Sequence, residues 1–268
     1  MTQHALVTGA SSGLGREFVR QLVIDRGMTV LATARRADRL ESVAAELPPG
    51  RVLVEPGDVT DAAFRRRLWD RAETLPGGID LLINNAGLGH YAEFADQDPG
   101  AADRVVALNV VALMDLTRMA AASMKRRGSG RILQISSVLG FYGIPYSAAY
   151  VASKHAVNGL VKCLRYELHG SGVRIQCACP GRTESEFSTV ALADPASTGP
   201  RPAKAPVDRV VRQILRGMDR GSTFIFPTWS AWATVALAVW LPGPYHLFME
   251  RWGPKHFREE LELMRGNV

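Results

Sequence analysis

Short apolar runs alternate with amphipathic segments over the first two thirds of the chain. Because the runs are almost wholly apolar, we expect strands at residues 5–8, 29–33, 51–56, 81–84, 131–136 and 174–179. Apolar positions recur at helical spacing over residues 14–26, 37–47, 61–74, 101–127 and 147–169. Helices that alternate with strands apolar on both faces predict a doubly wound parallel sheet, a Rossmann-like fold of the α/β class.

The regular alternation ends near residue 180. Residues 188–206 are rich in Ala, Pro, Ser, Thr and Gly, and we expect them to form a lid loop over the substrate. A helix at 207–219 and a last strand at 223–227 follow. The pattern contains no internal repeat, so we expect one Rossmann-type, cofactor-binding and catalytic domain over residues 1–228.

Residues 229–268 are apolar and then charged, and we expect them to form a helical extension of the same domain. The apolar part, 229–241, is bracketed by tryptophans and is shorter than the roughly 20 residues that span a bilayer. Two interpretations stay open. Residues 229–249 form a peripheral membrane contact, or the helix packs over the substrate cleft or at a subunit contact.

Composition and charge narrow the function classes. Hydrophobic residues make up 47% of the 268 and charged residues 22%, values typical of a globular protein. The net charge is +6, but the basic residues are scattered and no nucleic-acid module surrounds them. A basic balance can indicate a nucleic acid, an anionic membrane surface or an anionic ligand such as a nucleotide. We expect no nucleic-acid partner and interpret the basic clusters as solvated helix faces.

Three cysteines are too few for a disulfide framework. Cys177 and Cys179 read as buried thiols of a reducing compartment, and we expect no metal site. A strand-like run begins after four residues without a signal-peptide pattern. These features favour a cytoplasmic protein, with membrane association as the open alternative.

The first predicted strand leads into a glycine-rich turn and then a helix. Such a turn lets backbone N–H groups approach a pyrophosphate, which the helix dipole also favours. The spacing is GxxxGxG, and an ordinary tight turn is the alternative. The predicted cofactor contacts in this turn are Gly9, Ser11, Ser12, Gly13, Leu14 and Gly15.

The end of the second strand carries Arg35 and Arg36 where NAD-binding units usually have a carboxylate. Guanidinium groups fit a ribose 2′-phosphate, so we expect NADP(H) as the cofactor. Two solvent-exposed arginines at a helix start are the alternative.

Further polar groups follow the third and fourth strands, where strand ends open into a ligand crevice. Asp58 could accept from the adenine amino group or could cap the next helix. Two adjacent asparagines followed by Ala-Gly could bind cofactor or form a turn. The predicted cofactor contacts here are Asp58, Val59, Asn85, Ala86 and Gly87.

Tyr150 and Lys154 are four residues apart and share one face of the predicted helix. A nearby ammonium and a positively charged nicotinamide would lower the tyrosine pKa from about 10, so that the phenol could exchange a proton. Ser137, at a strand end, could hold the substrate oxygen. Asn109 lies inside a predicted helix, where asparagine more often faces solvent or accommodates a bend.

In order and spacing these motifs resemble the short-chain dehydrogenase/reductase family, from Thr8 to about Gly181. The resemblance implies a catalytic tetrad of Asn109, Ser137, Tyr150 and Lys154. In it Tyr150 protonates the substrate oxygen, Ser137 orients it, Lys154 binds the ribose and lowers the tyrosine pKa, and Asn109 holds a relay water.

The resemblance also implies that Arg35 grips the 2′-phosphate, and that the chain forms a homodimer or homotetramer through helices 101–127 and 147–169. It adds cofactor contacts at Pro180, Gly181 and Thr183, although Thr183 stands where relatives usually carry an aliphatic residue.

The residues around the predicted substrate position are apolar and aromatic, which favours a lipophilic carbonyl or alcohol. The predicted substrate contacts are His90, Leu139, Phe141, Tyr142 and Tyr150, with a surface position as the alternative for His90. The predicted function is an NADP(H)-dependent oxidoreductase. A non-catalytic NADP-binding sensor or scaffold is the main alternative, and a sugar-nucleotide epimerase or dehydratase is disfavoured by the turn spacing.

Overall fold

The computed structural model of the chain describes residues 3–183 and 205–258. In this part of the chain seven parallel strands form one sheet in the order β3-β2-β1-β4-β5-β6-β7. The strands are β1 (His4–Thr8), β2 (Thr29–Ala34), β3 (Val52–Pro56), β4 (Leu81–Asn84), β5 (Gly130–Ile135), β6 (Val173–Ala178) and β7 (Phe224–Ile225). Each predicted strand is present, and the predicted doubly wound sheet is confirmed.

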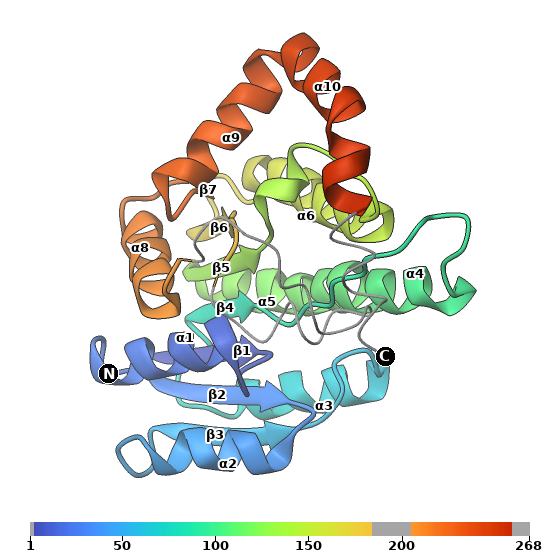
Figure 1. Ribbon diagram of the computed structural model, residues 1–268. Coiled ribbons are helices and arrows are strands. Elements are labelled where there is room, and N and C mark those ends of the chain that lie inside the picture. The colour runs from blue at the N-terminus through green and yellow to red at the C-terminus, as the bar shows by residue number, and fades with distance from the viewer. Residues whose placement is uncertain (1–2, 184–204, 259–268) are drawn as a thin grey trace.

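Helices cover both faces of this sheet (Figure 1). One face carries α1 (Gly13–Ile24), α2 (Ala37–Ala45) and α8 (Val207–Asp219). The other carries α3 (Ala62–Glu73), α5 (Leu113–Arg127) and α6 (Ala148–Glu167). The strands are apolar throughout because they supply side chains to both layers.

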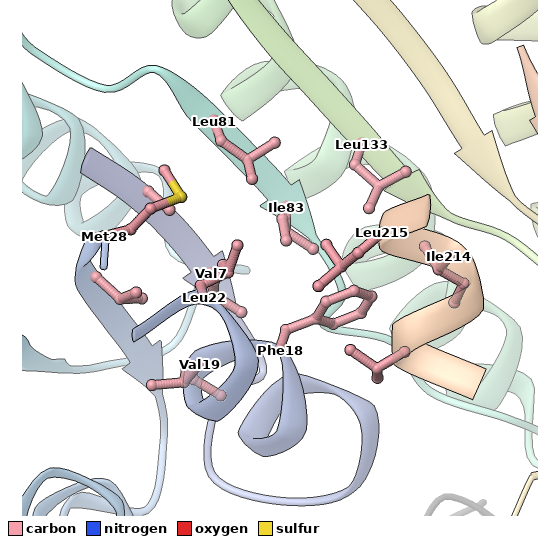
Figure 2. Close-up of a cluster of buried hydrophobic side chains, with 14 of the residues drawn as sticks. Val7, Phe18, Val19, Leu22, Met28, Leu81, Ile83, Leu133, Ile214 and Leu215 are labelled. Atoms are coloured by element: carbon pink, nitrogen blue, oxygen red, sulfur yellow. The ribbon is translucent and has the colours of Figure 1, made fainter. Parts of the chain in front are cut away.

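Alternation along the strands fills the two cores. In β1, Val7 joins the core under α1 and α8, while Leu6 joins the core on the opposite face. Figure 2 shows the first of these cores, in which Phe18 of α1 lies close to Ile83 of β4 and Leu215 of α8. Burial on both faces fixes the register of each strand.

The order of strand addition reverses between β1 and β4. From β1 the chain adds β2 and β3 on one side, and it then returns to add β4 to β7 on the other. The loops that leave β1 and β4 therefore diverge to opposite faces and leave a crevice at the carboxyl ends of these strands, where α/β proteins bind ligands.

The predicted helix at 101–127 begins two residues earlier and is not uniform. It consists of α4 (Pro99–Val106), a π-helical turn (Ala107–Ala112) and α5. Asp98 caps its start by accepting from the Gly100 N–H, and Pro99 occupies the first turn. Within the described residues, this is the one helix long and apolar enough to cross a membrane; here it packs beside β4, β5 and α6.

The predicted C-terminal extension forms two helices, α9 (Trp229–Trp240) and α10 (Pro242–Arg251), which meet at an angle (Figure 1). The inner side of α9 packs on the short helix η2 (Val138–Gly140) that follows β5. Apolar side chains on the outer side, such as Trp240, are exposed. The predicted lid falls on 188–206, of which residues 188–204 lie outside the described part of the chain.

Candidate active site

The glycine-rich turn after β1 is packed too tightly for side chains. Gly9 has a φ of +65°, a left-handed conformation that favours glycine. A Cβ atom on Gly15 would lie 2.1 Å from the Gly9 carbonyl oxygen. Ser12 is the N-cap of α1 and makes no side-chain cap hydrogen bond. The start of α1 thus offers backbone N–H groups and the positive end of a helix dipole to an anion.

A paired set of hydrogen bonds fastens this turn to the end of β4. The Asn85 side chain donates to the carbonyl oxygens of Thr8 (2.9 Å) and Gly9 (3.2 Å). The Thr8 hydroxyl accepts from the N–H groups of Asn85 (3.0 Å) and Ala86 (2.9 Å). Thr8 was not among the predicted site residues. Asn85 therefore shapes the turn from across the sheet.

The adjacent asparagines Asn84 and Asn85 contact different parts of the structure, because successive strand residues point to opposite faces of the sheet. Asn84 is buried, and its amide donates to Thr117 (3.0 Å) and Gln134 (3.1 Å). This network joins the sheet to α5. The interpretation of the pair as a simple turn is wrong.

The two arginines after β2 also differ. Arg36 donates from Nη2 to the hydroxyls of Ser12 (3.0 Å) and Ser11 (3.3 Å), so its guanidinium lies against the glycine-rich turn. Arg35 is exposed. A guanidinium beside an uncapped helix start suits a phosphorylated dinucleotide, so the residues present fit such a cofactor.

Asp58 does not cap the helix that follows it, as one interpretation required. Asp61 is the N-cap of α3 and accepts from Ala63 N–H (2.9 Å). Asp58 instead accepts from the Thr60 N–H (2.8 Å) in a local turn. Val59 is buried, and its carbonyl oxygen accepts from Arg65 (2.8 Å). The turn after β3 is thus rigid, with Asp58 at its start.

Tyr150 and Lys154 lie on one face of α6, at the carboxyl end of β5. The ammonium of Lys154 is 5.5 Å from the centre of the Tyr150 ring and donates to the Ile135 carbonyl oxygen (2.9 Å). A hydrogen bond joins the side chains of Ser137 and Tyr150. Ser137 is the N-cap of η2 and accepts from the Leu139 N–H (3.2 Å). Three predicted catalytic residues therefore meet at one point.

Burial sets the protonation of this pair. It raises the pKa of Tyr150 to about 12, although the hydrogen bond with Ser137 acts in the opposite direction. It lowers the pKa of Lys154 to about 8. In the protein by itself, desolvation of a phenolate outweighs the nearby amine. The expected lowering of the Tyr150 pKa also involves the oxidised nicotinamide and stays a prediction for the complex. At neutral pH the phenol carries its proton.

Asn109 lies in the π-helical turn and is buried, so the solvent-facing interpretation is wrong. Its Nδ2 donates to the Leu88 carbonyl oxygen (2.9 Å) and the Ser153 hydroxyl (3.0 Å). Its Oδ1 accepts from the Leu88 N–H (2.8 Å). Both amide donors are occupied, so a relay water could bind only by donating to Oδ1 or to the backbone carbonyl.

The segment after β6 closes the site from another side. The Pro180 carbonyl oxygen accepts from the Val138 N–H (3.2 Å). Gly181 lies next to Ala231 of α9, and Thr183 donates its hydroxyl to the Gly181 carbonyl oxygen (3.3 Å). Of the three predicted cofactor contacts in this segment, Pro180 thus lies beside η2 and Gly181 beside the C-terminal extension.

The predicted substrate residues differ in their surroundings. His90 is 7% exposed, which excludes the surface interpretation, and burial lowers its pKa. Leu139 and Tyr142 are half-buried and pack with α9, and the Tyr142 ring contacts Tyr245 at 5.4 Å. Phe141 packs against the same cluster and also on Phe224 and Phe226, at centroid distances of 5.4 and 5.6 Å. Its ring helps to fix η2 against the edge of the sheet.

A Rossmann-type sheet with a glycine-rich turn and a Tyr-Lys-Ser group defines a nicotinamide-dependent oxidoreductase. A family model described as short chain dehydrogenase matches residues 3–195. The chain belongs to the short-chain dehydrogenase/reductase family, whose members act on CH–OH and C=O groups with a nicotinamide cofactor.

Individual relatives are dehydrogenases of the same kind. The chain is 33% identical over 201 residues to a D-beta-hydroxybutyrate dehydrogenase of Rhizobium meliloti. This match covers 74% of this chain and 78% of the relative. It is 32% identical over 210 residues to a 3alpha-hydroxysteroid dehydrogenase of Mediterraneibacter gnavus, covering 77% and 83%. A short-chain dehydrogenase of Sphingobium yanoikuyae, solved with NADPH, has a TM-score of 0.78 and 29% identity over 93% of this chain and 96% of that one.

Proposed function

We propose that this chain is an NADP(H)-dependent reductase of a lipophilic ketone or aldehyde that also oxidises the corresponding alcohol. The observation that carries the proposal is the phenol of the half-buried Tyr150, hydrogen-bonded to Ser137 beside the ammonium of Lys154. The glycine-rich turn opens at the same edge of the sheet. A proton donor and a dinucleotide site in one crevice are what carbonyl reduction requires.

When bound, the nicotinamide cofactor supplies hydride to the carbonyl carbon or accepts it from the alcohol. In reduction, Tyr150 donates its proton to the carbonyl oxygen while the Ser137 hydroxyl orients that oxygen. Because burial keeps the phenol protonated, the donor is available throughout the neutral range. Oxidation needs the phenolate, so its rate rises with pH towards the pKa of Tyr150 in the complex.

The remaining members of the tetrad hold this geometry. Lys154 is anchored to Ile135 and, with its pKa near 8, is mostly charged at pH 7, where it stabilises a phenolate and can bind ribose hydroxyls. Asn109 fixes the Leu88 backbone after β4 through two hydrogen bonds. We propose these roles on the strength of these contacts.

Substitution of the phenol tests the chemistry. Tyr150→Phe removes the proton donor and retains the ring, and we expect kcat to fall about 10³-fold, within the usual range for general acid catalysis. Tyr166→Phe is the matched control, because Tyr166 is on the same helix and 72% exposed. NADPH absorbance is followed with steroid, retinoid, fatty aldehyde and quinone substrates. Full activity of Tyr150→Phe, with the control also active, would contradict the proposal.

The preference for NADP(H) is assigned to Arg36, because its guanidinium already lies at the glycine-rich turn. Arg36→Ala is expected to raise the KM for NADPH at least tenfold, since a bidentate phosphate contact is worth more than about 1.4 kcal/mol, and to leave the KM for NADH unchanged. Arg35→Ala serves as the comparison. Equal effects on both cofactors would remove this assignment, and an NADPH-specific effect confined to Arg35→Ala would transfer it.

The substrate class rests on the apolar surroundings of the tetrad. Leu139 and Tyr142 adjoin α9, and His90 is buried, which lowers its pKa. The steroid dehydrogenase among the relatives supports a bulky lipophilic substrate. The non-catalytic sensor is disfavoured, because Tyr150 and Lys154 are both present and in contact. We propose that residues 229–268 belong to the same domain as 1–228.

We also propose a homodimer or homotetramer. Members of the family are generally oligomeric. Val106, Val111 and Met114 are large apolar side chains exposed on the long helix, one of the two helices predicted to form the interface. Analytical ultracentrifugation is expected to give a mass of two or four chains, and a monomer at micromolar concentration would contradict this.

We propose that the protein is cytoplasmic and touches membranes through the outer surface of α9 and α10. Free, buried thiols at Cys177 and Cys179 suit a reducing compartment. Trp229, Trp232 and Trp240 are more than half exposed, as expected of an interfacial helix. Co-flotation with liposomes at low salt is expected, and replacing all three by Ser should abolish it. Wild-type protein that stays at the bottom of the gradient would exclude the contact.

A further inference from the structure

Asn158 is a buried amide on α6 that the sequence did not single out. It follows Lys154 by one turn and Tyr150 by two, so all three side chains lie on the same face of the helix. Its side chain is 2% exposed. A fully buried amide at this position needs partners for its two donors and its oxygen.

These partners lie at the two ends of the segment that carries Ser137. Asn158 Oδ1 accepts from the Ser136 hydroxyl (2.7 Å), and Nδ2 donates to the Gly140 carbonyl oxygen (2.8 Å). The amide thus bridges residues 136 and 140. Ser137, whose hydroxyl meets the phenol, lies between these two contacts.

Gly140 shows how close this contact is. A Cβ atom there would lie 2.4 Å from Asn158 Nδ2 and 2.9 Å from the Lys154 carbonyl oxygen. No side chain is therefore accommodated, although the φ of Gly140 is not in the left-handed region. The glycine allows η2 to approach the helix that carries the phenol.

Backbone hydrogen bonds also hold this segment to β6 and the residues after it: the Ser136 N–H donates to Ala178 (2.8 Å) and the Val138 N–H donates to Pro180 (3.2 Å). The Asn158 bridge adds the connection to α6. Ser137 itself makes local hydrogen bonds: its hydroxyl accepts from the Leu139 N–H (3.2 Å) and its carbonyl oxygen accepts from the Gly140 N–H (3.0 Å). Ser136 reaches α6 a second time through a longer contact, 3.4 Å, to the Lys154 carbonyl oxygen. Cys177 of β6 also donates to Asn158 Oδ1 (3.4 Å).

We propose that Asn158 is a positioning residue of the catalytic site: it sets the position of the Ser137 hydroxyl relative to the Tyr150 phenol. This inference rests on the proposed function. The amide acts through Ser136 and Gly140 and touches neither the substrate nor the reacting phenol. Without it, η2 shifts on α6 and the hydroxyl moves out of line with the phenol.

Asn158→Ala is expected to lower kcat on the order of tenfold to a hundredfold, the range for a displacement of about 1 Å. It is also expected to raise the apparent pKa of alcohol oxidation, because the Ser137 hydrogen bond favours the phenolate. The KM for NADPH should stay unchanged. The other titratable groups facing this region are Lys154, Cys177 and Cys179, and Asn158→Ala removes none of them.

Gln176→Ala is the matched control. Gln176 is also a 2% exposed amide with two backbone acceptors, Met218 (3.1 Å) and Ser222 (2.9 Å), and it lies outside the tetrad. Its loss should lower the melting temperature and leave the pH profile unchanged. A structural effect alone would make the two variants behave alike.

Ser136→Ala tests the bridge from its other end and removes only a hydroxyl group. We expect Ser136→Ala to lower kcat and raise the apparent pKa of alcohol oxidation, each by less than Asn158→Ala does. The Ser136→Ala/Asn158→Ala double variant should have a kcat no lower than that of Asn158→Ala. If Asn158→Ala does not fold, Ser136→Ala decides alone. Wild-type kcat and pH profiles in the folded variants would overturn the role of Asn158. Absence of carbonyl reduction by the unmodified chain would instead contradict the proposed function.

Discussion

The active site depends on a buried amine. Lys154 is 4% exposed, and burial of an ammonium costs free energy unless hydrogen bonds and charges compensate for it. The Ile135 carbonyl oxygen, at the end of β5, provides one such bond. This bond fixes α6 against the edge of the sheet, and it therefore also fixes Tyr150 one turn earlier. The same burial that makes the amine a weaker base makes the phenol a weaker acid.

Side-chain amides fix the position of further backbone segments around the crevice. Asn85 joins the end of β4 to the glycine-rich turn, Asn109 holds the backbone after β4, and Asn158 holds the segment after β5. Each amide thereby joins parts of the chain that lie far apart in the sequence. The loops around the crevice are thus fixed before any ligand binds, and preorganisation of this kind reduces the cost of reaching the reactive geometry.

Much of the fold follows from local patterns. The strands are recognisable because they are apolar throughout, and the Tyr150–Lys154 pair because helical spacing is regular. Other features depend on residues far apart in the chain. Thr8 contacts Asn85 across 77 positions, and Asn158 contacts Ser136 across 22. The sequence offers no local signal for either contact. The start at Pro99 could have been found from Asp98 and the proline, which together form a common helix start.

The direction of the Tyr150 pKa shift could not be predicted either, because desolvation depends on what the tertiary structure places over the phenol. The most direct test of the account is therefore a titration of Tyr150 itself, by NMR of tyrosine labelled with carbon-13 at Cζ and assigned with Tyr150→Phe. We expect a pKa near 12 in the protein alone and a lower value once the oxidised nicotinamide cofactor binds. A pKa near the ordinary value of about 10 in the protein alone, or one unchanged by the oxidised cofactor, would contradict the account.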